Sequence, residues 1–215
     1  MEVAFFYKTL LLIASYLFGA VPTAYVVYWF KRGTDIRKEG SGNVGGTNVA
    51  RTLGAGAGIM TIIIDMLKGF LPIMVAYFIY PQDLILVSII SVAVIVGHDF
   101  PVYIKFKGGK GIATSFGVIV GVCALPFTGQ PVYMRIGPIF TILAAAAIFF
   151  LIFRIVSVSS LAAAVATPLS FYFFHYPMVI VITAAVWSVL AFITHRGNIK
   201  RLINKQEKKI KGRGA

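Results

Sequence analysis

Long apolar segments separated by short polar ones recur along the whole chain. Each segment is long enough, or nearly so, to cross the roughly 30 Å hydrocarbon core of a bilayer as a helix. We therefore predict an all-α integral membrane protein that forms one polytopic domain over residues 1–215. The seven predicted transmembrane helices are residues 4–30, 54–80, 84–104, 112–127, 138–153, 158–174 and 178–194.

The composition supports a membrane protein and excludes other classes. Hydrophobic residues make up 59% of the chain and charged residues 13%, whereas soluble domains have about 45–50% and 25%. The single cysteine, Cys123, rules out an intramolecular disulfide and a cysteine-rich metal site. The first apolar segment is too long for a signal peptide, so we expect it to be retained. We expect a monomer with no metal or other cofactor.

The positive charges are distributed unevenly along the chain. Of the 20 lysines and arginines, only Lys8, Lys68 and Arg135 lie outside the C-terminal tail and the loops after the first, third and fifth segments. By the positive-inside rule, these loops and the C-terminus face the cytoplasm and the N-terminus faces outward. The same rule and anionic lipid explain the net charge of +13, so we expect membrane lipids and no nucleic acid as partners.

One polar segment, FKGGKGIATS at residues 106–115, places two lysines and three glycines directly before an apolar segment. Glycines let backbone N–H groups approach a ligand closely, and a helix beginning near Ile112 would point its positive end at the loop. The segment predicts an anion site, most naturally for phosphate. It lacks the spacing of a P-loop. The alternative is a basic, flexible loop at the membrane edge.

Two other polar segments lie on the same predicted membrane side. SGNVGGTNVAR, residues 41–51, combines hydroxyls, amides and glycines with Arg51, whose guanidinium suits phosphate. Turn chemistry alone is the alternative for this segment. In HRGNIKR, residues 195–201, His195 and Asn198 are three apart and would share a helix face, although an interfacial cap also explains the histidine. Together the three segments predict one cytoplasmic phosphate-binding site.

Ionisable residues also occur within the apolar segments. Asp65 and Lys68 are three apart, and we expect them to face the bundle and to form a structural ion pair. For His98 and Asp99, an interfacial turn and a functional role are both open.

The three polar segments together resemble the bacterial membrane glycerol-3-phosphate acyltransferases that use acyl phosphate as donor, the PlsY family. The resemblance covers essentially the whole chain and rests on SGNVGGTNVAR, GHDFPVYIKFKGGKGIATSFG and HRGNIKRLINKQEK. It implies a seven-span enzyme of the bacterial inner membrane with a cytoplasmic active site. The implied reaction transfers a fatty acyl group from acyl phosphate to the 1-hydroxyl of glycerol 3-phosphate, giving lysophosphatidate and inorganic phosphate.

The resemblance also implies roles for residues. The catalytic residues would be Ser41, Arg51, Lys110, His195 and Asn198, which handle glycerol 3-phosphate and the transition state. Asn43, Thr47 and the loop glycines would hold the acyl phosphate. The full set of implied substrate-binding residues is Ser41, Gly42, Asn43, Gly45, Thr47, Asn48, Arg51, Lys107, Gly108, Gly109, Lys110, Gly111, Thr114, His195 and Asn198. Either His195 or a phosphate oxygen of the donor accepts the hydroxyl proton.

Other membrane protein classes fit less well. Acyltransferases with an H-x-x-x-x-D pair are excluded because Tyr103, Ile180 and Lys200 stand five residues after the three histidines. A CDP-alcohol phosphotransferase needs clustered aspartates, and the four aspartates are scattered. A small transporter of phosphate or lipid is the remaining alternative, and it predicts broken helices with polar groups at the membrane midplane.

Overall fold

The computed structural model describes residues 2–126 and 130–210. In these residues the chain forms α-helices and two short 3₁₀ helices, with no strand. The α-helices are α1 (Glu2–Ala20), α2 (Thr23–Arg32), α3 (Gly46–Leu53), α4 (Ala55–Ile79), α5 (Leu84–Asp99), α6 (Ile112–Ala124), α7 (Val132–Phe153), α8 (Val156–Phe173), α9 (Met178–Thr194) and α10 (Arg196–Ile203). The 3₁₀ helices are η1 (Ile36–Lys38) and η2 (Val102–Ile104).

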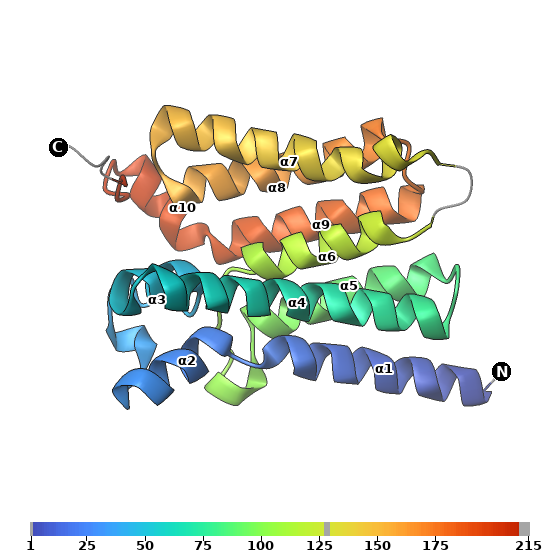
Figure 1. The fold of residues 1–215 in the computed structure, drawn as a ribbon, viewed down its shortest axis with the longest axis horizontal. Helices are drawn as coiled ribbons and strands as arrows, with labels where there is room; N and C mark the ends of the chain where they lie inside the picture. Colours follow the sequence, from blue (N-terminus) through green and yellow to red (C-terminus); the bar gives the residue numbers. More distant parts are fainter. Residues whose placement is uncertain (1, 127–129, 211–215) are drawn as a thin grey trace. The chain divides into compact units, whose positions relative to one another are not determined.

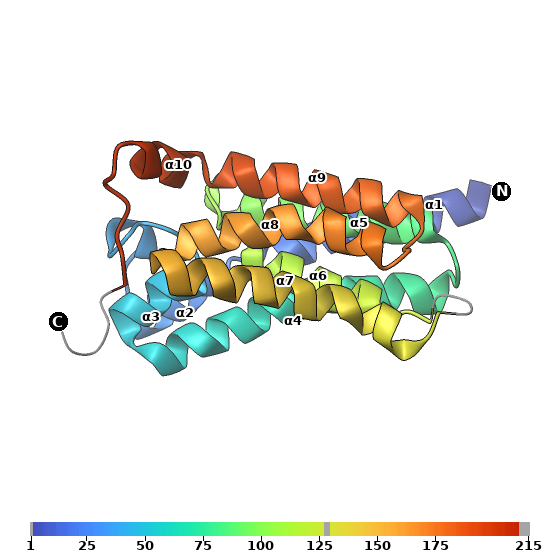
Figure 2. The same ribbon diagram turned by 90° about the horizontal axis from the view of Figure 1, so that it is seen from above.

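The helices group into two compact units, Met1–Leu125 and Pro126–Ala215. In the first unit, α4 packs along α6 and α1 packs along α5 (Figure 1). In the second unit, α8 packs against both α7 and α9 (Figure 2). Each polar segment identified in the sequence therefore belongs to one unit: the first two to the first unit, and the third to the second.

The α4–α6 contact depends on glycine. A Cβ atom on Gly69 of α4 would collide with the carbonyl oxygen of Thr114, and one on Gly117 of α6 would collide with that of Met66. Small residues let helix backbones approach closely where apolar side chains gain little by leaving lipid. These two glycines therefore fix the position of α6 and of the loop that precedes it.

Helices occur in all seven predicted apolar segments. Among the described residues, five regions have the length and hydropathy of a membrane span, and α9 with α10 forms a pair bent by 61° that would make six. Helix α6 has 13 residues and is shorter than the criterion for a span. The chain is a multi-pass membrane protein, and the count of seven spans stays a prediction.

The first predicted span, residues 4–30, agrees with the candidate membrane span Glu2–Arg32, which contains a break between two helices. Helix α1 ends at Ala20 and α2 begins at Thr23. The break falls at Pro22, which has no N–H to continue the backbone ladder and whose φ of −86° and ψ of 77° are not helical. The pattern of apolar residues continues across the break, so hydropathy alone does not reveal it.

The other predicted boundaries agree in part. Helix α7 begins at Val132 rather than at residue 138, and it contains Pro138. The predicted span 84–104 agrees with the candidate span Leu84–Ile104, within which helix α5 ends at Asp99 because Pro101 follows it, and η2 forms the remainder. Helix α6 ends at Ala124, and the predicted end of that segment, residue 127, lies outside the described residues.

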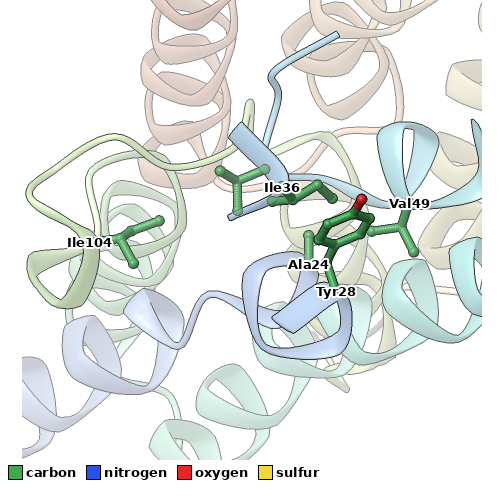
Figure 3. Close-up of a cluster of buried hydrophobic side chains, with 6 residues drawn as sticks. Ala24, Tyr28, Ile36, Val49 and Ile104 are labelled. Carbon is green, nitrogen blue, oxygen red and sulfur yellow. The ribbon is translucent and has the colours of Figure 1, made fainter. Parts of the chain in front are cut away.

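A small apolar core holds the polar segments of the first unit in place (Figure 3). It joins α2, η1, the segment containing α3, and η2. Its buried members are Ala24, Tyr28, Ile36, Val44, Val49 and Ile104. Burial of these side chains gives the loops between the long helices a defined shape, on which a binding site can be built.

Candidate active site

The segment of residues 41–51 is organised around Asn48, which is 1% exposed. Its side-chain oxygen accepts a hydrogen bond from the Ser41 N–H at 2.8 Å. Its amide nitrogen donates to the carbonyl oxygens of Glu39 at 3.0 Å and Asn43 at 3.1 Å. The resemblance implied that Asn48 contacts the substrate. In the structure its side chain instead forms hydrogen bonds with backbone groups of its own loop.

Part of this segment is a helix rather than a loop. Helix α3 begins after Gly45 and turns Thr47 and Arg51 toward the same side, because they are four residues apart. Both side chains are exposed, and so is Ser41, whose backbone Asn48 holds. A hydroxyl, a guanidinium and the Ser41 side chain therefore reach the surface from a rigid base.

The glycine loop lies directly on the C-terminal end of α5. The Gly108 N–H donates to the Asp99 carbonyl oxygen and the Gly109 N–H to the His98 carbonyl oxygen, both at 3.2 Å. A Cβ atom on Gly108 would collide with the His98 carbonyl, and one on Gly111 would press on the Asp99 carboxylate. Gly111 also has a φ of +67°, which favours glycine. The loop therefore needs glycine at these positions, because a side chain would prevent its close packing against the C-terminal end of α5.

The first two polar segments meet within the first unit. A Cβ atom on Gly109 would lie 2.8 Å from the carbonyl oxygen of Val44. Arg37 Nη1 donates to the Ile104 carbonyl at 3.1 Å, and Arg37 is also paired with Asp35 at 2.6 Å. Hydrogen bonding from the Arg37 side chain, which outweighs burial, holds the pKa of Asp35 below its ordinary value. A basic, glycine-rich loop and the segment preceding α3 are thus brought side by side.

The start of α6 lies in this region. Lys110, one residue before the Gly111 cap, is half-buried, and Lys107 is exposed. The N-terminal N–H groups and the positive end of α6 face the loop. Thr114 is fully buried, with its backbone against Gly69 of α4, so the structure places this residue behind the loop rather than on its surface. The arrangement suits an anion with several oxygens.

A buried carboxylate lies beneath the loop. Asp99 is 3% exposed, and neither of its carboxylate oxygens has a hydrogen-bond partner among the described residues. Asp65 and Lys68 of α4 form the expected ion pair at 2.9 Å, and both are buried. Among residues 2–126 and 130–210, no three His, Cys, Asp or Glu side chains gather as metal ligands would.

The third polar segment belongs to the second unit. His195 ends α9, and its Nδ1 lies 2.8 Å from the Ala191 carbonyl oxygen. The chain then bends into α10, which carries Asn198. Both side chains are buried. The predicted helical continuation is therefore interrupted by a bend, and His195 sits at that bend.

Glu207 anchors this segment and was missing from the predicted site. Its carboxylate accepts hydrogen bonds from Asn198 Nδ2 at 2.6 Å, Ser157 Oγ at 2.8 Å and Arg201 Nε at 2.6 Å. Burial raises the pKa of Glu207, but these three hydrogen bonds outweigh it and lower the pKa below its ordinary value. Glu207 is the only acidic residue after His195, which is the sequence signal that could have identified it.

The fold and these segments define a multi-pass helical membrane protein with a basic, glycine-rich loop before α6 and polar, partly basic segments around α3 and α10. Residues 9–205 match the model of the glycerol-3-phosphate acyltransferase family. The chain belongs to this family, which confirms the resemblance noted in the sequence.

Relatives match along nearly their whole length. The glycerol-3-phosphate acyltransferase of Endomicrobium trichonymphae is 41% identical over 207 residues, covering 95% of this chain and 96% of the relative. That of Bacillus subtilis is 36% identical over 202 residues, covering 94% and 97%.

Two solved structures are also similar. The crystal structure of PlsY, an integral membrane glycerol 3-phosphate acyltransferase, in its glycerol 3-phosphate form has a TM-score of 0.82 at 33% identity and covers 95% of this chain and 96% of that one. The lysophosphatidic acid form of PlsY has a TM-score of 0.79 at 32% identity and covers 95% of each chain.

Proposed function

We propose that this protein transfers a fatty acyl group from acyl phosphate to the sn-1 hydroxyl of glycerol 3-phosphate, giving lysophosphatidate and inorganic phosphate. The observation that carries the proposal is the contact between the glycine loop and the segment preceding α3 in a member of the glycerol-3-phosphate acyltransferase family. The names of the PlsY structures in their glycerol 3-phosphate and lysophosphatidic acid forms support the same acceptor and product.

The chemistry matches the residue types. Acyl phosphate is a mixed anhydride with a good leaving group, so the reaction needs positioning and charge neutralisation more than a strong base. Both substrates carry phosphate, and their mutual repulsion must be offset. In this proposal Arg51 and Lys110 supply positive charge, and the N-terminal N–H groups of α6, directly after the glycine loop, bind phosphate oxygens.

The remaining roles are assigned on the sequence motifs. Ser41, His195 and Asn198 handle glycerol 3-phosphate and the transition state. Asn43, Thr47 and the loop glycines hold the head of the acyl phosphate. The same segments also contain Gly42, Gly45 and Lys107 as substrate-binding residues. Asn48 holds the loop before α3 through its hydrogen bonds to Ser41, Glu39 and Asn43. The active site faces the cytoplasm of a bacterial inner membrane.

The geometry of His195 bears on the proton acceptor. A carbonyl oxygen only accepts hydrogen bonds, so the short contact with Ala191 requires a proton on Nδ1 and selects the Nδ1–H tautomer of a neutral ring. Nε2 is then the basic nitrogen of the ring. This tautomer supports His195 as acceptor of the hydroxyl proton, with a phosphate oxygen of the donor as the other candidate.

The transporter alternative predicts a broken helix, and the first span is indeed broken at Pro22. However, the carbonyl oxygens at this break already receive the ammonium group of Lys68, with Nζ 2.7 Å from the Val21 oxygen. The polar groups freed by this break are therefore engaged by a side chain of the protein itself. Membership of an acyltransferase family also favours the enzyme.

The test is an assay of the purified protein in detergent with glycerol 3-phosphate and one donor at a time. We expect lysophosphatidate from acyl phosphate and little from acyl-CoA or acyl carrier protein. Equal turnover with acyl-CoA as the sole donor would refute the choice of donor. No product with any donor would refute the acyltransferase itself.

A further inference from the structure

A cluster of three ionisable side chains lies inside the first unit, below the glycine loop. Lys68 Nζ is 2.9 Å from Asp65 Oδ1, and it donates to the carbonyl oxygens of Val21 at 2.7 Å and Gly19 at 3.4 Å. The helical hydrogen-bond ladder is interrupted here because the first span breaks at Pro22, and the Val21 oxygen also accepts from the Thr23 N–H at 3.0 Å. Lys68 therefore caps the end of α1 and neutralises Asp65 at the same time.

The third member is His98 of α5. Its Nδ1 lies 3.4 Å from Lys68 Nζ and 3.8 Å from Asp65 Oδ1. An ammonium group has only donors, so Nδ1 must accept, and the ring proton sits on Nε2. The ion pair thereby sets both the orientation and the tautomer of His98, as the second partner of a ligating histidine does in metal sites.

The protonated edge of the ring faces the glycine loop. A Cβ atom on Gly109 would collide with His98 Nε2, so the ring lies directly against this glycine. The backbone adds a second contact, because the Gly109 N–H donates to the His98 carbonyl oxygen at 3.2 Å. The position of the His98 side chain therefore determines how closely Gly109 packs on the C-terminal end of α5.

From these contacts we propose that Asp65, Lys68 and His98 form a positioning device for the glycine loop. Lys68 and Asp65 hold His98, and His98 holds Gly109, so that Lys110 and the N-terminal N–H groups of α6, which follow Gly109, are placed for the phosphate of a substrate. The phosphate part of this inference rests on the proposed function. Three buried ionisable groups are costly inside a membrane, and apolar residues of similar size would pack at lower cost, which argues for a role beyond filling space.

Substitution of Lys68 and His98 separates this role from simple packing. In Lys68→Met the donor to Nδ1 is lost, and we expect the KM of at least one phosphate-bearing substrate to rise by roughly 10- to 100-fold, the scale found for partners that orient ligating histidines. His98→Gln places an amide N–H near the Nε2 position and should stay within about threefold of wild type. His98→Asn reaches only the Nδ1 position and should resemble Lys68→Met.

The matched control is Lys8→Met, which breaks an ion pair of 2.6 Å with Asp83 in the same unit but contacts no residue of the loop. It should leave both KM values unchanged. If Lys68→Met folds, as judged by its melting temperature, and its KM values equal those of wild type, the positioning role is overturned. The same holds if His98→Gln and His98→Asn are equally impaired.

A second measurement does not depend on activity. In protein labelled with ¹⁵N-histidine, the His98 signal is identified by its loss in His98→Gln. Wild type should show the Nε2–H tautomer, and Lys68→Met should shift the ring to a mixture of tautomers. An Nδ1–H tautomer or an imidazolium in wild type would overturn the inference. A wild-type enzyme that acylates no glycerol 3-phosphate would refute the proposed function, while the NMR result would still decide the state of His98.

Discussion

Asn48 and Asn198 are buried amides whose hydrogen bonds serve their own chain. Asn48 joins three backbone groups of the loop before α3, and Asn198 donates to Glu207. A buried amide that lost these partners would leave unsatisfied polar groups, which cost more than the hydrogen bonds themselves contribute. At the scale of single residues, each of these two polar segments is therefore held in shape by an amide that sequence patterns present as a ligand.

Replacing Asn48 tests this positioning role. In Asn48→Ala the Ser41 N–H and the carbonyls of Glu39 and Asn43 lose their partner, so we expect a loss of about 2–4 kcal/mol in unfolding free energy. Thr52→Val is the control, because its hydroxyl only shares carbonyl oxygens that α3 already uses, and it should cost less than about 1 kcal/mol. Equal stability of Asn48→Ala and wild type would show that the amide does not organise the loop.

Lys110 tests the anion-binding role of the glycine loop. As the leaving phosphate gains charge, a lysine at this position acts more strongly on the transition state than on the ground state. Lys110→Ala should lower kcat by roughly 10²–10³-fold. Lys110→Arg should restore little, because a planar guanidinium does not replace a compact ammonium between glycines.

The control is Lys105→Ala, an exposed lysine of the same loop region, which should keep kcat within about twofold of wild type. Steady-state kinetics for both substrates provide the measurement. If Lys110→Ala keeps more than about a third of the wild-type kcat, the loop is a tether at the membrane edge.

At the scale of elements, hydropathy predicts the long helices well because a bilayer requires continuous apolar segments. Helix α3 and the break at Pro22 are not visible in hydropathy: α3 is held to its preceding loop by the hydrogen bonds of Asn48, and the break comes from Pro22, with Lys68 donating to the carbonyl oxygens beside it. The pairing of Asp65 with Lys68 was predictable from their spacing. Its link to His98 and Gly109 was not, because it joins three separate segments.

Glu207, which links α10 to the start of α8 through Asn198 and Ser157, gives a prediction for how stability depends on pH. The folded pKa of Glu207 is lowered, so its ion pair and hydrogen bonds stabilise the fold above the unfolded pKa and are lost as pH falls through the folded value. We expect Glu207→Gln to melt below wild type at pH 7. The difference should shrink as pH falls below the ordinary glutamate value of 4.5.

Glu39→Gln is the control for this prediction, because Glu39 is an exposed glutamate. Its melting temperature should follow that of wild type at every pH. A Glu207→Gln difference that is constant between pH 7 and about pH 3 would contradict the assignment of this carboxylate as ionised and hydrogen-bonded.

At the scale of the whole molecule, the charge distribution predicts the orientation in the membrane. Only Lys8, Lys68 and Arg135 depart from the positive-inside pattern, and Lys8 and Lys68 are paired with Asp83 and Asp65. A reporter fused after the C-terminus should be cytoplasmic, and one fused before the N-terminus should be outside. Reporters on the same side would contradict seven spans.

The class of protein was predictable from the sequence, because three polar segments stand out in an apolar chain, and the roles of the site residues stay predictions. The meeting of the first two segments follows from the core around Ile36 and Ile104, which no local pattern reveals. Glu207 was missed because a single acid in a basic tail resembles ordinary surface composition. The burial of Thr114 was missed because α6 packs on Gly69 through its backbone.

The most direct test of the central claim follows the ³¹P signals of purified protein mixed with acyl phosphate and glycerol 3-phosphate. The account predicts that the acyl phosphate signal falls while inorganic phosphate and 1-acyl-glycerol 3-phosphate appear in equal amounts. Without glycerol 3-phosphate, the donor should persist. Release of phosphate at the same rate in the absence of the acceptor, or a persisting donor in its presence, would contradict the proposed reaction.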